Sequence, residues 1–334
     1  MKILLYFEGR NILSKSGIQR AYINQKTALE KAGFEVTTDR KSQDYDVLHL
    51  NTYGLSSLNL AHKAKKEGKK IVIYAHSTEE DFRNSFVGSN SLAPAYKNYL
   101  VKLYKMADTI IAPSDYTKKL LQGYGIKRSI FVISNGVDLP EYAKNVLKEE
   151  AFQKVFNIKE NEKIVISAGG YFERKGIIDF VKLAKELPEY RFIWFGGRTP
   201  SALIPPHIRK IVRKSHPKNV EFSGYIKGDI LEGAFSFADC FFFPSHEERE
   251  GIVVLEALAS KQKVLLRDIE VYEGWLTNGV NCFKGKNNHE FKEKLIELVE
   301  NPYEDLKRNA FATARERSIP EISKKFIEVY HTLK

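Results

Sequence analysis

The feature that most constrains the fold is a regular alternation of short apolar runs with longer amphipathic stretches, which occurs twice along the chain. The first set of apolar runs comprises Ile3–Phe7, Val47–Asn51, Ile71–Ala75, Thr109–Ala112 and Phe131–Ile133. The amphipathic stretches between them predict helices at Gln19–Ala32, Leu58–Lys66 and Tyr116–Leu121. Buried strands that alternate with helices predict a parallel sheet covered on both faces.

The same alternation restarts in the second half of the chain and predicts a second domain of the same kind. Its apolar runs are Lys163–Ala168, Arg191–Phe195, Val220–Phe222, Cys240–Phe243 and Lys263–Leu266. Helices are expected near Ile177–Glu186, Ile230–Ala238 and Val253–Ser260. Residues 139–160 are charged and carry no strand pattern, so they are predicted to be the linker.

We therefore expect an α/β protein of two Rossmann-like, doubly wound domains. The N-terminal domain is predicted over residues 1–140 and the C-terminal domain over residues 141–318. The last helix, within residues 319–334, is expected to pack back on the N-terminal domain. Sheets of this type bind ligands at the carboxyl ends of their strands, so a crevice is expected at that edge of each domain.

Composition excludes several classes of protein. Apolar residues make up 43% of the chain and charged residues 28%, which excludes wholesale disorder. Cys240 and Cys282, the two cysteines, provide neither a disulfide framework nor a metal cluster, and a reducing compartment is expected. The apolar opening Met1–Phe7 is too short for a signal peptide, and no run approaches the ~20 residues that a membrane helix needs.

The net charge of +11 indicates an anionic partner or a solvated lysine-rich surface, and charge alone does not separate the two. A basic face of this kind could serve nucleic acid, anionic lipid or a phosphorylated ligand. The chain carries no nucleic-acid recognition motif, so nucleic acid is not expected as a partner.

The most informative stretch runs from Phe243 to Ala259. A strand is expected to end at Phe243, a charged loop follows, and Gly251 opens a helix whose free N–H groups attract a phosphate. Glu248 lies in the loop and Glu256 about two helical turns inside, so the two carboxylates can accept hydrogen bonds from different parts of one sugar-containing ligand. An acidic surface loop followed by a solvent-facing glutamate is the alternative interpretation.

These residues resemble the retaining glycosyltransferases of family 4, which have the GT-B architecture of two Rossmann-like domains. The spacing of Glu248 and Glu256 is typical of that family, as is the Pro-Ser before the loop. Further matching segments are Val220–Tyr225, Phe237–Ser245, the Asn-Gly-Val-Asp of residues 135–138 and Arg174-Lys175-Gly176. The resemblance covers nearly the whole chain.

The resemblance implies a role for each matching residue of the C-terminal domain, which would bind the nucleotide sugar. Glu248 would bind hydroxyls of the transferred sugar, and Glu256 would bind the ribose. Lys175 with Arg174 would neutralise the diphosphate. The remaining donor-binding positions are Gly170 and the backbone N–H groups of Gly251, Ile252 and Val253.

Two residues of the N-terminal domain also match the family. Gly17 matches the loop after the first strand, which approaches the diphosphate, and His76 matches a histidine near the anomeric carbon. Taken alone, Gly17 is a turn residue and His76 a hydrogen-bonded histidine at a strand end. Cations at a helix start oppose the helix dipole, so Arg174 and Lys175 indicate an anionic partner.

The chain departs from the family pattern at the donor site. Family members often carry Gly-Arg where this chain has Gly169-Gly170, so Arg174 is expected to substitute for the missing arginine. Arg249-Glu250-Gly251 stands where Gly-Phe-Gly is usual, which puts the contacts to the donor sugar in doubt. The resemblance implies retention of anomeric configuration with no metal ion or other cofactor, because the two cations take the charge of the leaving group.

Within the family the chain is most similar to bacterial glycolipid synthases, over Phe172–Gly176, Glu250–Lys261 and Asp268–Leu276. This implies transfer of a hexose from UDP-glucose or UDP-galactose to diacylglycerol or monoglucosyldiacylglycerol, giving an α-linked glycolipid. Such an enzyme would lie peripherally on an anionic membrane, at its cytoplasmic face. The alternatives are a capsule or cell-wall transferase that uses a polyprenyl diphosphate sugar, and a non-catalytic nucleotide-sugar binding protein.

The acceptor is expected to dock on the N-terminal domain, through a basic, tyrosine-rich helix over residues 96–106 and the loop before it. Such residues suit a membrane surface, but a helix packed on its own core has the same pattern. The candidate residues are Phe82, Arg83, Phe86, Tyr96, Lys97, Tyr99, Leu100, Lys102 and Leu103.

Overall fold

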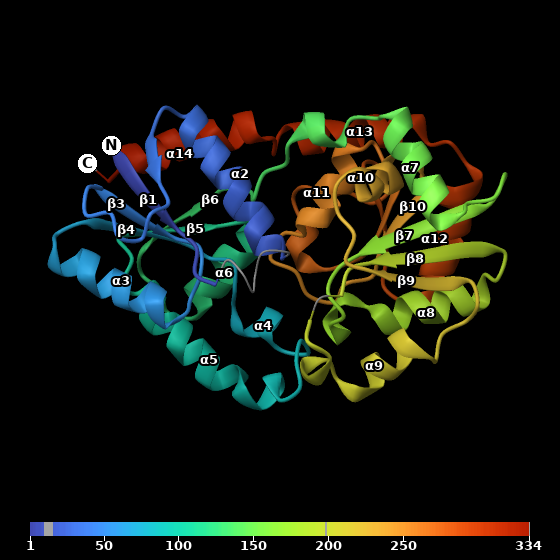
Figure 1. The fold of residues 1–334 in the computed structure, drawn as a ribbon, viewed down its shortest axis with the longest axis horizontal. Helices are drawn as coiled ribbons and strands as arrows, with labels where there is room; N and C mark the ends of the chain where they lie inside the picture. The colour runs from blue at the N-terminus through green and yellow to red at the C-terminus, as the bar shows by residue number, and fades with distance from the viewer. Residues whose placement is uncertain (10–15, 198, 334) are drawn as a thin grey trace. The chain divides into compact units, whose positions relative to one another are not determined.

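The computed structural model describes residues 1–9, 16–197 and 199–333, which form two compact units (Figure 1). Unit 1 comprises Met1–Phe82, Asn90–Val137 and Arg317–Lys334, and unit 2 comprises Arg83–Ser89 and Asp138–Glu316. Among the described helices, none combines the length and the apolar character needed to cross a membrane.

Unit 1 is built on a six-stranded parallel sheet in the order β2-β1-β3-β4-β5-β6. The strands are β1 (Lys2–Tyr6), β2 (Glu35–Thr37), β3 (Val47–Leu50), β4 (Lys70–Tyr74), β5 (Thr109–Ala112) and β6 (Ser129–Val132). The helices are α2 (Gly17–Lys31), α3 (Leu55–Lys66), α4 (Glu79–Phe82), α5 (Ser89–Tyr104), α6 (Asp115–Gly123) and α14 (Ile319–His331).

Alternate residues of the unit 1 strands enter two different cores, because successive side chains of a strand point to opposite faces. Leu4 and Leu48 join a core that includes residues of α3 and α5. Ile3 and Val47 join a core that includes residues of α2 and α14. Burial on both faces explains why these strands read as continuous apolar runs in the sequence.

Unit 2 has a second six-stranded parallel sheet, in the order β12-β11-β10-β7-β8-β9. The strands are β7 (Lys163–Ala168), β8 (Tyr190–Phe195), β9 (Val220–Gly224), β10 (Cys240–Phe243), β11 (Val264–Arg267) and β12 (Phe283–Gly285). The α-helices are α7 (Val146–Phe156), α8 (Ile177–Glu186), α9 (Pro206–Arg213), α10 (Asp229–Phe237), α11 (Ile252–Ala259), α12 (Asn288–Glu300) and α13 (Glu304–Arg315).

Each sheet has one point where the direction of strand addition reverses. In unit 2 this point lies between β7 and β10, and in unit 1 it lies between β1 and β3. Loops that leave adjacent strands at such a point diverge to opposite faces and open the crevice in which α/β sheets bind their ligands. The loops after β7 and β10 are therefore the place to look for a site in unit 2.

The predicted α/β fold of two doubly wound sheets is confirmed, and each expected strand is present. Two short edge strands, β2 and β12, were not expected. Residues 139–160, interpreted as a linker, contain α7, whose Phe152 and Phe156 are buried against Phe195. The segment Arg83–Ser89 lies in unit 2 although the chain on both sides of it lies in unit 1.

Candidate active site

The loop after β10 leads into the start of α11, which is an anion-attracting feature of unit 2. Gly251 caps α11 with a positive φ of 92°, no side chain caps the helix, and its first turn carries no acidic residue. Ile252 and Val253 are half-buried at this start, and their N–H groups lack an intrahelical acceptor by construction. The positive end of the α11 dipole is thus available to a phosphate.

The corresponding helix start of unit 1 is already occupied by a carboxylate of the chain. Glu8, after β1, accepts hydrogen bonds from the N–H groups of Ser56 at 3.0 Å and Ser57 at 2.9 Å, at the start of α3. A Cβ at Gly54, the residue before α3, would lie 2.5 Å from the Glu8 carboxyl group. Glu8 therefore accepts hydrogen bonds from the first N–H groups of α3, whereas the first N–H groups of α11 stay available to a ligand.

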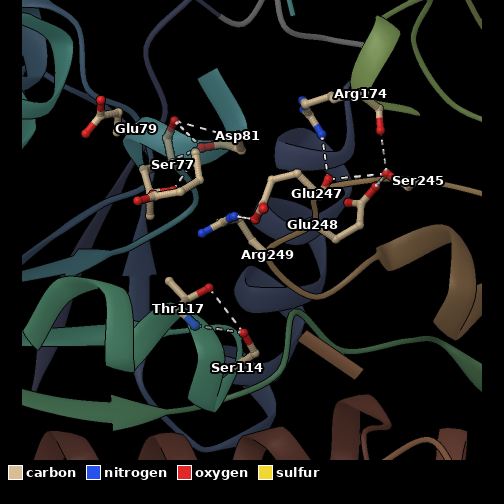
Figure 2. Close-up of polar contacts among 12 residues, drawn as sticks. Ser77, Glu79, Asp81, Ser114, Thr117, Arg174, Ser245, Glu247, Glu248 and Arg249 are labelled. Carbon is tan, nitrogen blue, oxygen red and sulfur yellow. Dashed lines mark hydrogen bonds and ion pairs between the residues drawn. The ribbon is translucent and has the colours of Figure 1, made fainter. Parts of the chain in front are cut away.

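Lys175 and Glu248 meet beside the α11 start, although they are 73 residues apart in the chain. Lys175 ends a short 3₁₀ turn, η2 (Glu173–Lys175), in the loop after β7, and its Nζ forms an ion pair with Glu248 Oε1. The Ser245 hydroxyl donates a 2.7 Å hydrogen bond to the same carboxylate oxygen. Glu248 is only 6% exposed, and Lys175 and Ser245 hold its carboxylate in one position; Figure 2 shows the contact with Ser245.

Arg174 fastens three segments of unit 2 together. Its Nε donates to Ser85 Oγ at 2.8 Å, and its Nη1 donates to the carbonyl of Glu247 at 3.0 Å (Figure 2). Its backbone carbonyl accepts from the N–H of His246 at 2.7 Å. Arg174 thus positions the loop that carries Glu248 through its Nε and Nη1 groups. Its Nη2 group is available to bind a ligand.

Glycines around η2 allow the two loops to approach each other closely. A Cβ at Gly176, which has a φ of 79°, would lie 2.3 Å from the carbonyl oxygen of Pro244 in the loop after β10. A Cβ at Gly170 would lie 2.7 Å from the Phe172 ring, and one at Gly169 would contact the stem of Lys175 at 3.7 Å. A side chain at Gly176 would therefore push the loop after β7 away from the loop after β10.

Glu256 and Tyr272 complete the surroundings of α11. Glu256 is 6% exposed and lies four residues after Ile252, hence on the same face of the helix as its start. Tyr272, at the end of η4 (Glu270–Tyr272), is fully buried, and its hydroxyl has no hydrogen-bond partner among the described residues. A Cβ at Gly251 would lie 3.3 Å from that hydroxyl. The sequence analysis assigned no role to Tyr272 or Ser85 and did not predict the hydrogen bond from Ser245 to Glu248.

In unit 1, His76 follows the end of β4 and is 7% exposed. Its Nε2 lies 2.9 Å from Asn51 Oδ1 and 3.5 Å from Gln25 Nε2, and its ring stacks on Tyr74 with centroids 4.4 Å apart. Burial, with His49 as a lesser cause, lowers the pKa of His76 to about 3. The imidazole is therefore neutral at physiological pH and is held in a fixed orientation.

His76 belongs to a buried polar cluster at the carboxyl ends of β3 and β4. Three polar atoms of the cluster have no hydrogen-bond partner among the described residues: Gln25 Oε1, His49 Nε2 and Asn51 Nδ2. Burial lowers the pKa of His49 to about 3, and its Nδ1 is hydrogen-bonded to the Tyr330 hydroxyl of α14. The sequence identified His76 but not this cluster.

Gly17 is the exposed first residue of α2, which is capped by the Ser16 hydroxyl, at 3.4 Å from the N–H of Gln19. The chain before Ser16, residues 10–15, lies outside the described residues. Gly17 therefore lies at the start of the first helix of unit 1, and its expected role near the diphosphate stays a prediction.

The expected membrane contact of α5 needs correction, because part of its apolar face packs on the protein. Leu100 and Leu103 are fully buried in the core of unit 1, and Tyr96 and Tyr99 are half-buried against that core. Lys102 is exposed on α5. The helical period of the sequence revealed an apolar face, and that face covers the sheet instead of a lipid surface.

The remaining candidates for a membrane contact are also engaged. Phe82 stacks on Tyr96 with ring centroids 4.3 Å apart, and Lys97 forms an ion pair with Glu79 at 3.2 Å. Phe86, in unit 2, packs edge-on against Phe172. Arg83 is half-buried in the same segment as Phe86.

Carboxylates in a metal-binding spacing occur at Asp44-Tyr45-Asp46, before β3. Asp46 accepts from the backbone N–H of Lys2 at 2.7 Å, and Asp44 accepts from its side chain at 2.9 Å. Both carboxylates thus lie at the amino end of the unit 1 sheet, opposite the edge at which ligands of such sheets bind. No cluster of three His, Cys, Asp or Glu side chains suited to a metal ion occurs in the described ranges.

The two six-stranded parallel sheets have the GT-B fold of glycosyltransferases. HepE from Anabaena, whose crystal structure contains UDP-glucose, superposes with a TM-score of 0.79 at 18% identity, covering 99% of this chain and all of that one. Sucrose-phosphate synthase from Thermosynechococcus elongatus superposes with a TM-score of 0.74 at 18% identity, covering 98% of this chain and 80% of that one. These likenesses establish the fold.

Sequence comparison fixes the family. The model of Glycosyltransferase Family 4 matches residues 34–141, and that of Glycosyl transferases group 1 matches residues 148–317. The chain belongs to this family of glycosyltransferases. It is 43% identical to the processive diacylglycerol alpha-glucosyltransferase of Acholeplasma laidlawii, over 99% of this chain and 98% of that one. It is 27% identical to the alpha-galactosylglucosyldiacylglycerol synthase of Streptococcus pneumoniae, over 96% and 88% of the two chains.

Proposed function

We propose that this enzyme transfers a hexose from a UDP-hexose to monoglucosyldiacylglycerol, giving an α-linked diglycosyldiacylglycerol. The observation that carries the donor assignment is the meeting of Lys175, Glu248 and the uncapped start of α11 at the strand-order reversal of unit 2. The lipid acceptor is supported by the two relatives above, whose names are those of diacylglycerol glycosyltransferases.

To catalyse this transfer, the site must stabilise the negative charge of the departing diphosphate. The bond between the anomeric carbon and the phosphate oxygen breaks, the acceptor oxygen bonds to the same face of that carbon, and the acceptor proton passes to the released phosphate. Lys175 and the N–H groups of Gly251, Ile252 and Val253 hold the growing negative charge, with Arg174 contributing its Nη2 group. Glu248 and Glu256 hold the sugar and ribose hydroxyls. Gly170 leaves room for the phosphates.

Donor binding exchanges one partner of Lys175 for another. Without donor, Lys175 neutralises Glu248, and with donor it turns to the diphosphate while Glu248 accepts sugar hydroxyls. The ion pair keeps both side chains in place until the donor arrives. For unit 1 we propose that Gly17 and the neutral, oriented His76 take the roles that the family resemblance assigns to them.

We propose that the transfer retains the anomeric configuration and needs no metal ion, and both points can be tested together. Because Lys175 and the helix start supply the positive charge, turnover should continue unchanged in excess EDTA, and the product linkage should be α by the anomeric proton coupling in NMR. Loss of turnover in EDTA that Mg²⁺ or Mn²⁺ restores would contradict the metal-free proposal. A β-linked product would contradict retention.

The acceptor is tested by incubating the enzyme with radiolabelled UDP-glucose or UDP-galactose and one acceptor at a time, followed by lipid chromatography. The acceptors are diacylglycerol, monoglucosyldiacylglycerol and a polyprenyl diphosphate sugar. We expect label in a diglycosyldiacylglycerol. Label only in the polyprenyl product would support a capsule or cell-wall transferase instead, and donor binding without transfer to any acceptor would support a non-catalytic binding protein.

The enzyme is further proposed to work as a peripheral protein on an anionic membrane, at its cytoplasmic face, because its acceptor is a membrane lipid. The net charge of +11 supports this location.

A further inference from the structure

The segment over residues 190–220 of unit 2 contains no Asp or Glu and seven Lys and Arg. It includes η3 (Ser201–Leu203) and the basic helix α9, labelled in Figure 1. The apolar side of α9 is used inside the protein, because Ile208 is fully buried in the unit 2 core and Ile211 and Val212 pack against it. The charges of α9 are therefore left on the outer side.

The outer side of α9 carries cations, although Glu173 lies 3.1 Å from His207 at the start of the helix. Lys210, Arg213 and Lys214 are exposed, and Lys210 and Lys214 form no ion pair with any described residue. Arg209 Nη1 and Arg213 Nη2 donate to Ser201 at 3.1 Å each, which fixes η3 against the helix. The positive surface is thus part of a folded, ordered element.

Exposed aliphatic side chains stand directly beside these cations. Leu203 of η3 is 45% exposed and Val87 is 54% exposed. The Val87 N–H donates to the Leu203 carbonyl at 3.0 Å, so the two residues form one protrusion although they are far apart in the chain. We call Val87, Leu203, Arg209, Lys210, Arg213 and Lys214 the α9 surface.

We propose that the α9 surface is a membrane-docking surface of this enzyme, in which Val87 and Leu203 enter the interface and the α9 cations contact anionic lipid headgroups. Aliphatic side chains next to uncompensated cations are the combination that interfacial binding uses. A nucleic-acid surface would instead place aromatic side chains among the cations. This inference rests on the proposed lipid acceptor and locates the membrane contact in unit 2, whereas the sequence pointed to α5 of unit 1 and to the loop before it, including Arg83 and Phe86.

The test is sedimentation of the full chain with phosphatidylcholine vesicles, with and without phosphatidylglycerol. Wild type should bind the anionic vesicles and release with added salt. Lys210→Gln with Lys214→Gln should weaken binding about 30-fold, at about fivefold for each cation near the surface. Leu203→Ser with Val87→Ser should weaken it about tenfold by removing apolar contact.

The matched control is Lys65→Gln with Lys66→Gln, two exposed lysines on α3. It removes the same charge outside the α9 surface and should change binding less than about twofold, because it leaves the proposed contact residues intact. Equal loss in control and α9 variants would overturn the proposal in favour of net charge. Loss only in Lys102→Gln with Lys105→Gln, at the end of α5 and just after it, or binding to nucleic acid without binding to vesicles, would also overturn it.

A second assay separates docking from the proposed function. The α9 variants should lose kcat/KM on monoglucosyldiacylglycerol in anionic vesicles but keep it when the same lipid is presented in neutral detergent micelles. Equal activity of variants and wild type on vesicles would overturn the docking surface and leave the function standing. Absence of lipid glycosylation by wild type in both formats would overturn the proposed function, whatever the vesicle binding.

Discussion

At the scale of single residues, the site depends on the position of one buried carboxylate. Glu248 is held in one position by Lys175 and Ser245, and Arg174 holds the loop that carries it. A buried charge that loses its partner is strongly destabilising, so Lys175 and Glu248 each depend on the other before any ligand binds.

Lys175→Ala and Glu248→Ala should each lower turnover at least tenfold, which corresponds to about 1.4 kcal/mol of transition-state stabilisation. The Lys175→Ala variant lacks the positive charge that stabilises the diphosphate, and the Glu248→Ala variant lacks the carboxylate that binds the sugar hydroxyls. The measurement is kcat with UDP-hexose and lipid acceptor. The matched control is Lys148→Ala, which breaks the ion pair with Glu232 between α7 and α10 and should keep kcat per folded molecule. Near-normal kcat in both site variants would contradict the assignment.

Two buried histidines should make unit 1 sensitive to acid. His49 and His76 have pKa values of about 3 in the folded protein, against about 6.5 when unfolded. Between these values the unfolded chain binds more protons, so the free energy of unfolding falls as pH falls below about 6.5. At pH 5 each histidine contributes a loss of roughly 2 kcal/mol relative to neutral pH.

The variant His49→Phe with Tyr330→Phe removes one of these histidines together with its hydrogen-bond partner. Urea unfolding at pH 7 and pH 5 should show a smaller loss of stability in acid for this variant than for wild type. Tyr330→Phe alone keeps His49 and should keep the wild-type difference between the two pH values. A double variant as acid-sensitive as wild type would contradict the burial of a neutral His49.

At the scale of elements, the α11 start depends on the backbone of Gly251. Its φ of 92° lies in the region that L-residues avoid, and a Cβ there would lie 3.2 Å from the Val254 side chain. The turn that presents the helix N–H groups therefore needs glycine.

Gly251→Ala should destabilise unit 2 by roughly 1–2 kcal/mol and weaken UDP binding, because the strained turn shifts the donors of α11. Gly125→Ala is the control: its φ is 74° and a Cβ there meets no atom within 4 Å. It should show a similar loss of stability with unchanged UDP affinity. Urea unfolding and UDP titration measure the two effects, and unchanged UDP affinity in Gly251→Ala would exclude α11 as the phosphate site.

The sequence predicted the elements whose pattern is local and missed those fixed by packing. The continuous apolar runs identified the central strands, and the spacing of Glu248 and Glu256 with Lys175 predicted a donor site in the loops after β7 and β10. The edge strands β2 and β12 are three residues long, which is too short to show a periodic pattern of apolar residues in the sequence. The hydrogen bond from Arg174 to Ser85 joins residues that are 89 positions apart in the sequence. Ser85 lies in Arg83–Ser89, the short segment that leaves unit 1 and belongs to unit 2, and no local sequence pattern predicts such a contact. Leu100 and Leu103 show that an apolar helical face does not by itself distinguish lipid from core.

At the scale of the whole molecule, the chain ends in the unit where it began. α14 packs on α2 in unit 1, where the Ser323 hydroxyl donates to the carbonyl of Ala28 at 2.7 Å (Figure 1). The buried residues of this C-terminal segment in the unit 1 core are Ile319, Ile322, Phe326, Val329, Tyr330 and Leu333. Unit 1 is therefore completed only when the last residues of the chain are present.

Deletion of residues 317–334 should unfold unit 1 and spare unit 2. Burial of six large side chains contributes roughly 9–18 kcal/mol, at about 1.5–3 kcal/mol each, which matches or exceeds the roughly 5–15 kcal/mol stability of a typical protein. Hydrogen exchange should show amides of β1 and β3 exposed, with β7 and β10 still protected. Protection of β1 at the wild-type level would contradict the role of α14.

The central claim is that the uncapped start of α11, with Lys175 and Glu248, is where this glycosyltransferase holds its donor. A crystal structure of the full chain with UDP tests it most directly. We predict the diphosphate within hydrogen-bond distance of the N–H groups at Ile252 and Val253 and of Lys175 Nζ, with the ribose at Glu256. A UDP molecule bound with its diphosphate away from α11 and Lys175 would contradict the account.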